Sequence, residues 1–279
     1  MPVRIVTDSA CDLSDADLAE WGIGLVPLSI RFGDDEFVDR TELSTSEFYR
    51  RLANSEQLPE TSAPSPGAFA AMFNSLADEG ADAVVCINIS EALSATIQAA
   101  RTAATSDDVS IPVHVVNSQS VTGGLGSIVL GCARAARDGK SAEEIVAMAE
   151  DMRDRTRIYA TLDTLENLKK GGRIGGAQAA FGAMLSIKPL LDLSSGEVVA
   201  AGKQRTRKKS LAWVREQIEN AGDVENLAIL HSNASDIDEF VASLSAMPAV
   251  TSARTDTIGA VIGTHGGPGI IGITYQIKG

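Results

Sequence analysis

Residues 83–89 read Ala-Val-Val-Cys-Ile-Asn-Ile, an almost unbroken apolar run, and Ser90 follows directly. Such a run is typical of a strand that is buried on both faces of a parallel sheet, because helices cover both faces there. Shorter apolar runs precede and follow it and alternate with segments of helical spacing. Strands are expected at 3–7, 24–30, 83–89 and 113–116, and helices at 15–21, 44–53, 66–77, 93–104 and 120–137. This order predicts an α/β fold with a parallel sheet.

The alternation of strands and helices changes near residue 140. A capping box at 141–144 begins a helix that extends to about residue 154. Further strands are expected at 158–161, 185–193, 198–202, 227–230, 258–263 and 270–277, with helices at 162–170, 205–219 and 237–246. Residues 194–196, Ser-Ser-Gly, suit a hairpin turn, and 264–269 suit a loop between the last two strands. The chain is therefore expected to have two domains, a Rossmann-like parallel-sheet α/β domain at 1–155 and an α+β domain with a mixed sheet at 156–279.

The charges exclude some classes of protein. The chain has 24 basic and 37 acidic residues, a net charge of −13, which argues against a nucleic acid as the main partner. Residues 1–150 hold 9 of the basic and 23 of the acidic residues, and the rest of the chain holds 15 and 14. The net charge is therefore −14 in the first segment and +1 in the second, which favours two domains with different surfaces. The N-terminus does not resemble a signal peptide and no apolar run approaches ~18 residues, so a cytoplasmic protein without a stable membrane anchor is expected.

Several catalytic motifs are incomplete in this sequence. Residues 139–141, Gly-Lys-Ser, resemble the end of a P-loop, but Arg134 stands where that motif needs glycine. There is no G-x-S-x-G nucleophile elbow. Three dispersed histidines and three dispersed cysteines make a metal cluster or a disulfide framework improbable. We therefore expect no metal and no cofactor.

Hydroxyl-bearing residues follow the expected strands of the first half. Ser9 comes after Asp8, Thr61 and Ser62 precede a helix, Ser94 follows the 83–89 strand, and Ser118 ends the next. Ligands of an open parallel sheet bind beyond the carboxyl ends of its strands, where helix N-termini offer free N–H groups to an anion. A small anion such as a carboxylate is therefore the expected ligand. Each of these residues alone is more often an ordinary helix cap.

The second half adds three motifs. Residues 169–174, Lys-Lys-Gly-Gly-Arg-Ile, present Arg173 from a turn after a helix, although a plain helix end would have a similar sequence. Residues 203–209 hold five cations in seven positions, which is either a solvated helix start or a binding surface. His265 lies beside a glycine-rich turn that lets the backbone approach a ligand closely.

Together these motifs resemble the DegV family of bacterial fatty-acid-binding proteins. The segments that carry the resemblance are 6–9, 26–28, 61–67, 89–90, 93–96, 168–174, 187–189, 205–206 and 263–269. Two positions depart from the family pattern. Ala95 stands where glycine is usual, and Asn117 stands where aspartate is usual. Neither departure removes a hydroxyl that is expected to meet the ligand.

The resemblance implies that a long-chain fatty acid lies between the two domains. Its carboxylate would contact the hydroxyls of Thr61 and Ser94, with Ser62 nearby. His265 and Arg173 would lie near the head group and assist a reaction there. Ser9 and Ser118 complete the expected ligand-binding set. The resemblance also implies a partner, the separate ATP-binding subunit of a fatty acid kinase, so this chain is expected to be a carrier with no catalytic residue of its own.

Two other functions remain open from the sequence. The chain could be a hydrolase or phosphotransferase acting on a small anion through Asp8 and His265, although it lacks a metal or phosphate motif. It could also be a DNA-associated regulator that uses the cations of 203–209, although the net charge disfavours this.

Overall fold

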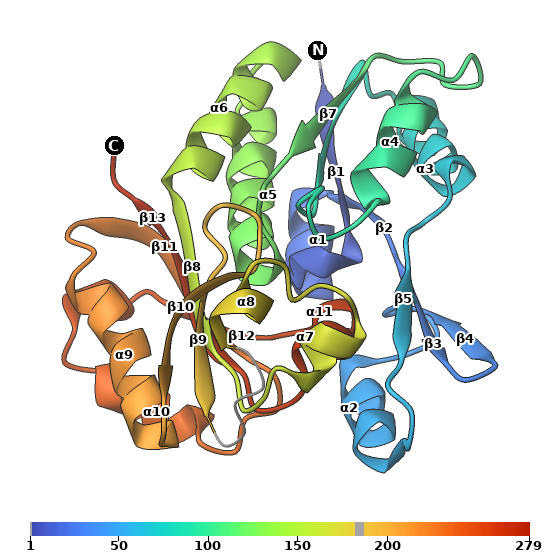
Figure 1. Ribbon diagram of the computed structural model, residues 1–279. Helices are drawn as coiled ribbons and strands as arrows, with labels where there is room; N and C mark the ends of the chain where they lie inside the picture. The colour runs from blue at the N-terminus through green and yellow to red at the C-terminus, as the bar shows by residue number, and fades with distance from the viewer. Residues whose placement is uncertain (1, 182–186) are drawn as a thin grey trace.

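The computed structural model describes residues 2–181 and 187–279. These residues form a four-stranded, a six-stranded and a three-stranded sheet (Figure 1). The four-stranded sheet lies in the first half of the chain and is entirely parallel, whereas the six-stranded sheet lies in the second half and is mixed. The predicted fold class, α/β with a parallel sheet followed by a mixed sheet, is confirmed.

The parallel sheet has the strand order β2-β1-β6-β7. Its strands are β1 (Val3–Asp8), β2 (Gly24–Val26), β6 (Ala83–Asn88) and β7 (Val113–Asn117). β6 pairs with a neighbour on each side, and its residues after Ala83 are buried. Helices α3 (Pro66–Asp78) and α4 (Thr96–Ala104) cover one face, and α5 (Thr122–Arg137) and α6 (Ala142–Arg155) cover the other (Figure 1). Burial on both faces explains the apolar run at 83–89.

The strand expected at 24–30 is wrong in one respect, because the structure divides it in two. β2 ends before Pro27, and β3 (Ser29–Phe32) joins a different, antiparallel sheet with β4 (Asp35–Val38) and β5 (Glu60–Ser62). Proline has no N–H to donate to a neighbouring strand, so it marks the point where the chain changes sheets. The remaining short segments of the first half are η1 (Ser9–Cys11), α1 (Asp15–Trp21) and α2 (Thr45–Asn54).

The mixed sheet has the strand order β10-β9-β8-β13-β11-β12. Its strands are β8 (Thr156–Thr161), β9 (Lys188–Asp192), β10 (Val199–Gln204), β11 (Val224–His231), β12 (Arg254–Thr257) and β13 (Ile271–Ile277). The expected hairpin is confirmed, since β9 and β10 pair antiparallel. Residues 185 and 186 of that expectation lie outside the described residues. The helices of this half are α7 (Glu166–Lys170), α8 (Ala177–Phe181), α9 (Arg207–Glu219), α10 (Ile237–Leu244), α11 (Ala260–Gly266) and the 3-10 turn η2 (Pro248–Val250).

The strand expected at 258–263 and the loop expected at 264–269 are wrong, because most of this segment forms helix α11. The β-branched residues suggested a strand, but tertiary packing overrides that preference. Thr264 Oγ1 donates to the Ala260 carbonyl one turn earlier. A Cβ placed on Gly263 would lie 2.8 Å from both Phe48 and Tyr49 of α2, so the missing side chain lets α11 pack tightly there. His265 therefore lies on a helix rather than on a loop.

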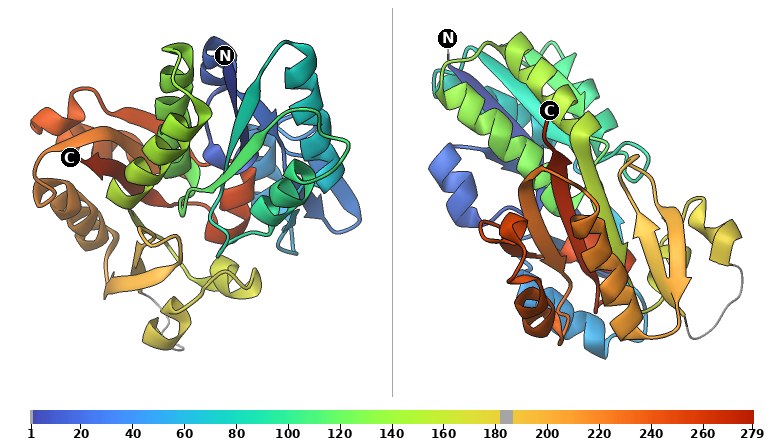
Figure 2. Two further views of the ribbon diagram at one scale, coloured as in Figure 1. Left: turned by 90° about the horizontal axis from the view of Figure 1, so that it is seen from above. Right: turned by 90° about the vertical axis from the view of Figure 1, so that its left-hand side faces the viewer.

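Helix α5 packs against both main sheets. Figure 2 shows α5 and α6, in green, between the strands of the first half and those of the second. A Cβ placed on Gly123 would lie 2.7 Å from Leu230 of β11, and one on Gly124 would lie 2.7 Å from Ile158 of β8. A Cβ on Gly126 would lie 2.7 Å from the Cys11 carbonyl oxygen. Glycine at 123 and 124 therefore sets how closely the two halves approach, and Gly126 lets α5 pack closely on η1.

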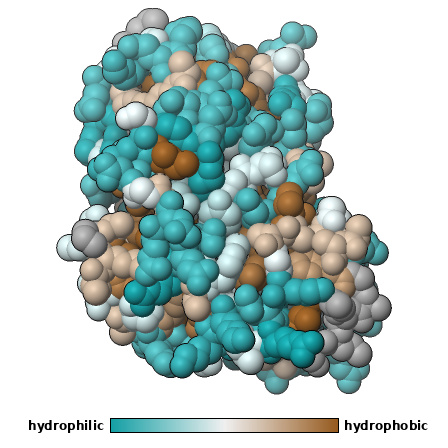
Figure 3. Space-filling model, turned by 60° about the vertical axis from the view of Figure 1, so that its left-hand side comes forward, coloured by the Kyte–Doolittle hydropathy of each residue, from teal (hydrophilic) through white to brown (hydrophobic). Residues whose placement is uncertain are grey.

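The outer surface is mostly polar. The face in Figure 3 is largely hydrophilic with scattered apolar residues, and Val199 is the exposed large apolar residue of the described chain. Within residues 2–181 and 187–279, no helix combines the length and the apolar character that crossing a membrane requires.

Replacing Gly126 by alanine should destabilise the fold by roughly 1–3 kcal/mol, because the backbone oxygen of Cys11 cannot move aside for the new methyl group. The matched control is Gly131→Ala in the same helix, whose new methyl would meet the flexible end of Met152. Both changes gain the same helix propensity. Urea unfolding measures the difference, and equal midpoints for the two variants would contradict the proposed packing constraint.

Candidate functional site

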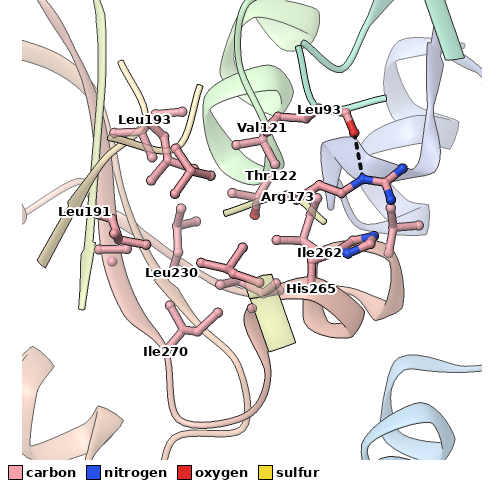
Figure 4. Close-up of a pocket in the computed structure, with 18 of the residues that line it drawn as sticks. Leu93, Val121, Thr122, Arg173, Leu191, Leu193, Leu230, Ile262, His265 and Ile270 are labelled. Carbon is pink, nitrogen blue, oxygen red and sulfur yellow. Dashed lines mark hydrogen bonds between the residues drawn. The ribbon is translucent and has the colours of Figure 1, made fainter. Parts of the chain in front are cut away.

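A deep, mainly apolar pocket lies between the parallel and the mixed sheet. Side chains from both halves of the chain line it, and Figure 4 shows many of them pointing into the same space. The apolar members include Leu28, Ile89, Leu93 and Val121 from the first half and Ile158, Leu162, Leu191, Leu193, Leu230 and Ile270 from the second. We call this space the apolar pocket. Its walls suit a long alkyl chain.

Four of the expected site residues line this pocket together. Thr61 comes from β5, Ser94 from the loop between β6 and α4, Arg173 from the loop between α7 and α8, and His265 from α11. Their sequence positions are far apart, and the fold gathers them. The pocket therefore combines apolar walls with an imidazole, a guanidinium and hydroxyl-bearing residues, among them Thr61 and Ser94.

His265 is hydrogen-bonded to Thr61, and its imidazole is neutral. Its Nε2 lies 2.9 Å from Thr61 Oγ1, and either group can donate in this pair. Burial, with a smaller effect of the nearby Arg173 charge, lowers the pKa of His265 to about 4. Its Nδ1 is buried and has no hydrogen-bond partner among the described residues. An uncharged imidazole can support the Thr61 hydroxyl while that hydroxyl hydrogen-bonds an anion.

Arg173 spans the two halves of the chain at the mouth of the pocket. Its Nε donates to the Leu93 carbonyl at 3.3 Å, the bond drawn in Figure 4, and its Nη1 donates to the Gly171 carbonyl at 2.8 Å. Both acceptors are uncharged. Within the part of the chain that the structure describes, no carboxylate forms an ion pair with Arg173. Its positive charge therefore remains available to an anion at the mouth.

Ser94 lies at the start of helix α4. Its Oγ lies 2.8 Å from Thr96 Oγ1 and accepts from the Thr96 N–H at 3.3 Å. Ala95, the residue at the cap position, gives no side-chain cap. Ser94 thus takes part of the capping role that its sequence position suggested, while its half-buried side chain also faces the apolar pocket.

A second, polar hollow adjoins the apolar pocket. Thr61, Arg173 and His265 line both spaces, and Lys170 and Asn167 line the second one. We call it the mouth recess. The polar residues at the end of the apolar pocket can therefore be approached from a side that the alkyl walls do not occupy.

Three other expected site residues do not line either space. Ser9 Oγ accepts from the Leu28 N–H at 3.1 Å, and Ser118 Oγ donates to the Asn88 carbonyl at 2.6 Å. Both hydroxyls are buried and hold the loops at the strand ends. Ser62 is exposed and follows Thr61 in β5, so the two side chains point to opposite faces of the strand.

Asp8 is fully buried and serves the structure of the sheet. Its carboxylate accepts from the N–H groups of Ala10 and Ile89 and from the Asn88 amide. Burial raises its pKa to about 6, against the opposing effect of these bonds. Asp8 lines neither the apolar pocket nor the mouth recess, so it is not brought together with His265. This placement disfavours a hydrolase that uses both.

The cation-rich segment 203–209 is partly used within the fold. Arg207 forms two hydrogen bonds to the Asp236 carboxylate at 2.8 and 2.9 Å. Lys208 and Lys209 are exposed on the first turn of α9. In the described residues, no group of three or more metal-ligating side chains is placed to hold a metal ion.

Sequence reasoning missed the backbone contribution to the site. The carbonyls of Leu93 and Gly171 hold Arg173, and any residue type could supply them. It also missed which apolar residues form the walls, because these look like core residues in the sequence. The Gly-Gly pair that follows Lys170 is the sequence feature that could have pointed to Gly171.

Comparisons with known proteins identify the family and the solved structures that this chain resembles. Residues 2–278 match the sequence model of a family described as uncharacterised proteins of the DegV family. A DegV domain-containing protein of Streptomyces coelicolor is 36% identical over 280 residues, which cover 99% of each chain. A solved structure that describes fatty acid binding of a DegV family protein from Thermus thermophilus has 33% identity and a TM-score of 0.91, and the match covers all of both chains. A stearic acid-binding protein from Eubacterium ventriosum has 27% identity and a TM-score of 0.87, with 99% of this chain and 98% of that chain covered.

The imidazole of His265 should remain neutral at every pH above about 5, because its pKa is lowered to about 4. Its NMR signals, assigned with a His265→Gln variant, should show no inflection between pH 5.5 and 8. The unfolded chain takes up this proton near pH 6.5, so the group should lower the free energy of unfolding as the pH falls from about 6.5 to about 4. A titration midpoint near 6.5 in the folded protein would contradict this assignment.

Proposed function

Because this chain belongs to the DegV family, we propose that it binds a long-chain fatty acid in the apolar pocket, with the carboxylate at the mouth. The observation that carries the proposal is the meeting of Thr61, Ser94, Arg173 and His265 at one pocket whose other walls are almost entirely apolar. The fatty acids bound by the related proteins described above support it.

The two parts of the pocket have different roles in this proposal. Burying roughly 15 methylenes at ~0.8 kcal/mol each contributes on the order of 12 kcal/mol before ordering costs. The alkyl chain therefore supplies most of the affinity. The carboxylate needs hydrogen bonds, since otherwise burial would favour its protonated form. The hydroxyls of Thr61 and Ser94 supply these bonds, and Arg173 supplies a positive charge.

We propose further that the chain is a carrier that presents its fatty acid to a separate ATP-binding kinase subunit. In that reaction a carboxylate oxygen bonds to the γ-phosphorus of ATP, the bond from that phosphorus to ADP breaks, and an acyl phosphate and ADP result. The mouth recess supports this role, because it adjoins the expected carboxylate position from outside the alkyl walls. The reaction would place the protein in the cytoplasm, where ATP is available.

The chain is also proposed to divide into domains between Arg155 and Thr156. The strand order supports this boundary, since β1–β7 form the parallel and the three-stranded sheets, whereas β8–β13 form the mixed sheet. The proposed ligand then lies between the domains.

Purified protein should carry a fatty acid. Denaturation, organic extraction and mass spectrometry are expected to yield a long-chain acid in near-stoichiometric amount. Thr61→Val keeps the shape of the side chain but removes the hydroxyl, so it should weaken binding of added stearic acid about tenfold, whereas Thr102→Val on the exposed side of α4 should not. Protein that is empty and also fails to bind added long-chain acids would overturn the proposal.

Arg173→Ala and His265→Ala should each slow acyl phosphate formation when the protein is supplied with a partner kinase and ATP. Both remove groups beside the position where negative charge develops, and effects of roughly tenfold or more are expected. Arg134→Ala is the control, since Arg134 is an exposed arginine stacked on Trp21. Unchanged rates for both site variants would remove them from the transfer step.

A further inference from the structure

Gly171 lies against His265 of the proposed head-group site and against Asn167, which lines the mouth recess. A Cβ placed on Gly171 would lie 2.4 Å from His265 Nδ1, well inside any normal contact. On another side the same Cβ would lie 3.1 Å from the Asn167 carbonyl oxygen, which belongs to the backbone of α7 and cannot yield easily. The imidazole would therefore have to move to admit a side chain at 171.

The backbone of Gly171 does not itself require glycine. Its φ is −74° and its ψ is −6°, values that every residue adopts readily at the end of a helix. Its N–H donates to the Asn167 carbonyl at 2.8 Å, an ordinary closing bond of α7. The reason for glycine at this position is therefore the space that His265 occupies.

The carbonyl of Gly171 has a second role, because it accepts the 2.8 Å hydrogen bond from Arg173 Nη1. The same residue thus borders the imidazole with its missing side chain and holds the guanidinium with its oxygen. His265 is in turn fixed on its other side by Thr61, at 2.9 Å. Any displacement of the ring that relieves the clash would alter the geometry of that hydrogen bond and disturb the Arg173 guanidinium nearby.

We propose that Gly171 is a positioning residue for head-group recognition. It keeps the His265 ring against Thr61 and anchors Arg173, and so it determines affinity for the carboxylate but not for the alkyl chain. The inference rests on the proposed function, since it assumes that a carboxylate is bound at the mouth of the apolar pocket.

The test compares stearic acid with stearyl alcohol, which has the same chain but no carboxylate, by displacement of a fluorescent fatty acid. Gly171→Ala should weaken binding of the acid roughly tenfold and leave binding of the alcohol unchanged. The matched control is Gly176→Ala in the following loop, where a new Cβ meets nothing within 4 Å. The NMR signals of His265 should shift in Gly171→Ala and not in Gly176→Ala.

A double-mutant cycle separates positioning from a general structural effect. In a His265→Ala background the clash is absent, so adding Gly171→Ala should cause no further loss of acid affinity. Additive losses, equal losses for acid and alcohol, or wild-type binding by Gly171→Ala would each overturn the inference. A wild-type protein that binds neither ligand would instead overturn the proposed function and the inference with it.

Discussion

The close approach of helix α5 to both main sheets is the constraint on which the rest of the structure depends. Gly123 and Gly124 leave no side chain between the helix and Leu230 or Ile158. Leu230 and Ile158 also line the apolar pocket. Val121 and Thr122, at the start of the helix, line it as well. The contact that joins the halves of the chain therefore also sets the width of the space between them. A larger side chain at these glycines would push the sheets apart and change the pocket at the same time.

The polar end of the pocket solves a different physical problem. A buried carboxylate is costly unless several donors meet it, and a full counter-ion pair within the protein would compete with it. The structure supplies hydroxyls and a neutral imidazole, and it holds Arg173 by backbone carbonyls rather than by a carboxylate. The guanidinium is therefore oriented without being neutralised. This arrangement favours recognition of an anion that arrives from outside.

The sequence predicted the parallel sheet and most elements because their signals are local. The apolar run at 83–89 and the capping box at 141–144 correspond to β6 and to α6. Helix α11 was not predictable in this way, because its β-branched residues favour a strand, whereas its packing against Phe48 and Tyr49 depends on the tertiary fold. The break at Pro27 was visible, but the change of sheet that follows it depends on pairing with residues 35–38 and 60–62.

The site shows the same division between local and tertiary information. Hydroxyls at strand ends pointed to Thr61 and Ser94, but the same reasoning selected Ser9 and Ser118, whose bonds to Leu28 and Asn88 are used within the loops. Cap and ligand contacts use the same residue types at the same positions, so a single sequence does not separate them. The orientation of Arg173 by two carbonyls has no side-chain signature at all.

The electrostatics of the mouth couple ligand charge to the proton on His265. Burial is the main reason that its pKa lies near 4, and the positive charge of Arg173 adds to that effect. A carboxylate bound between the two would oppose the Arg173 field and favour the imidazolium form, so its arrival would raise the pKa of His265. By linkage, the anion would then bind more tightly where the imidazole is protonated. Because burial and the Arg173 charge hold that pKa well below its ordinary value, the ring is neutral near pH 7. A carboxylate bound at the mouth would thus meet a neutral ring that can hydrogen-bond.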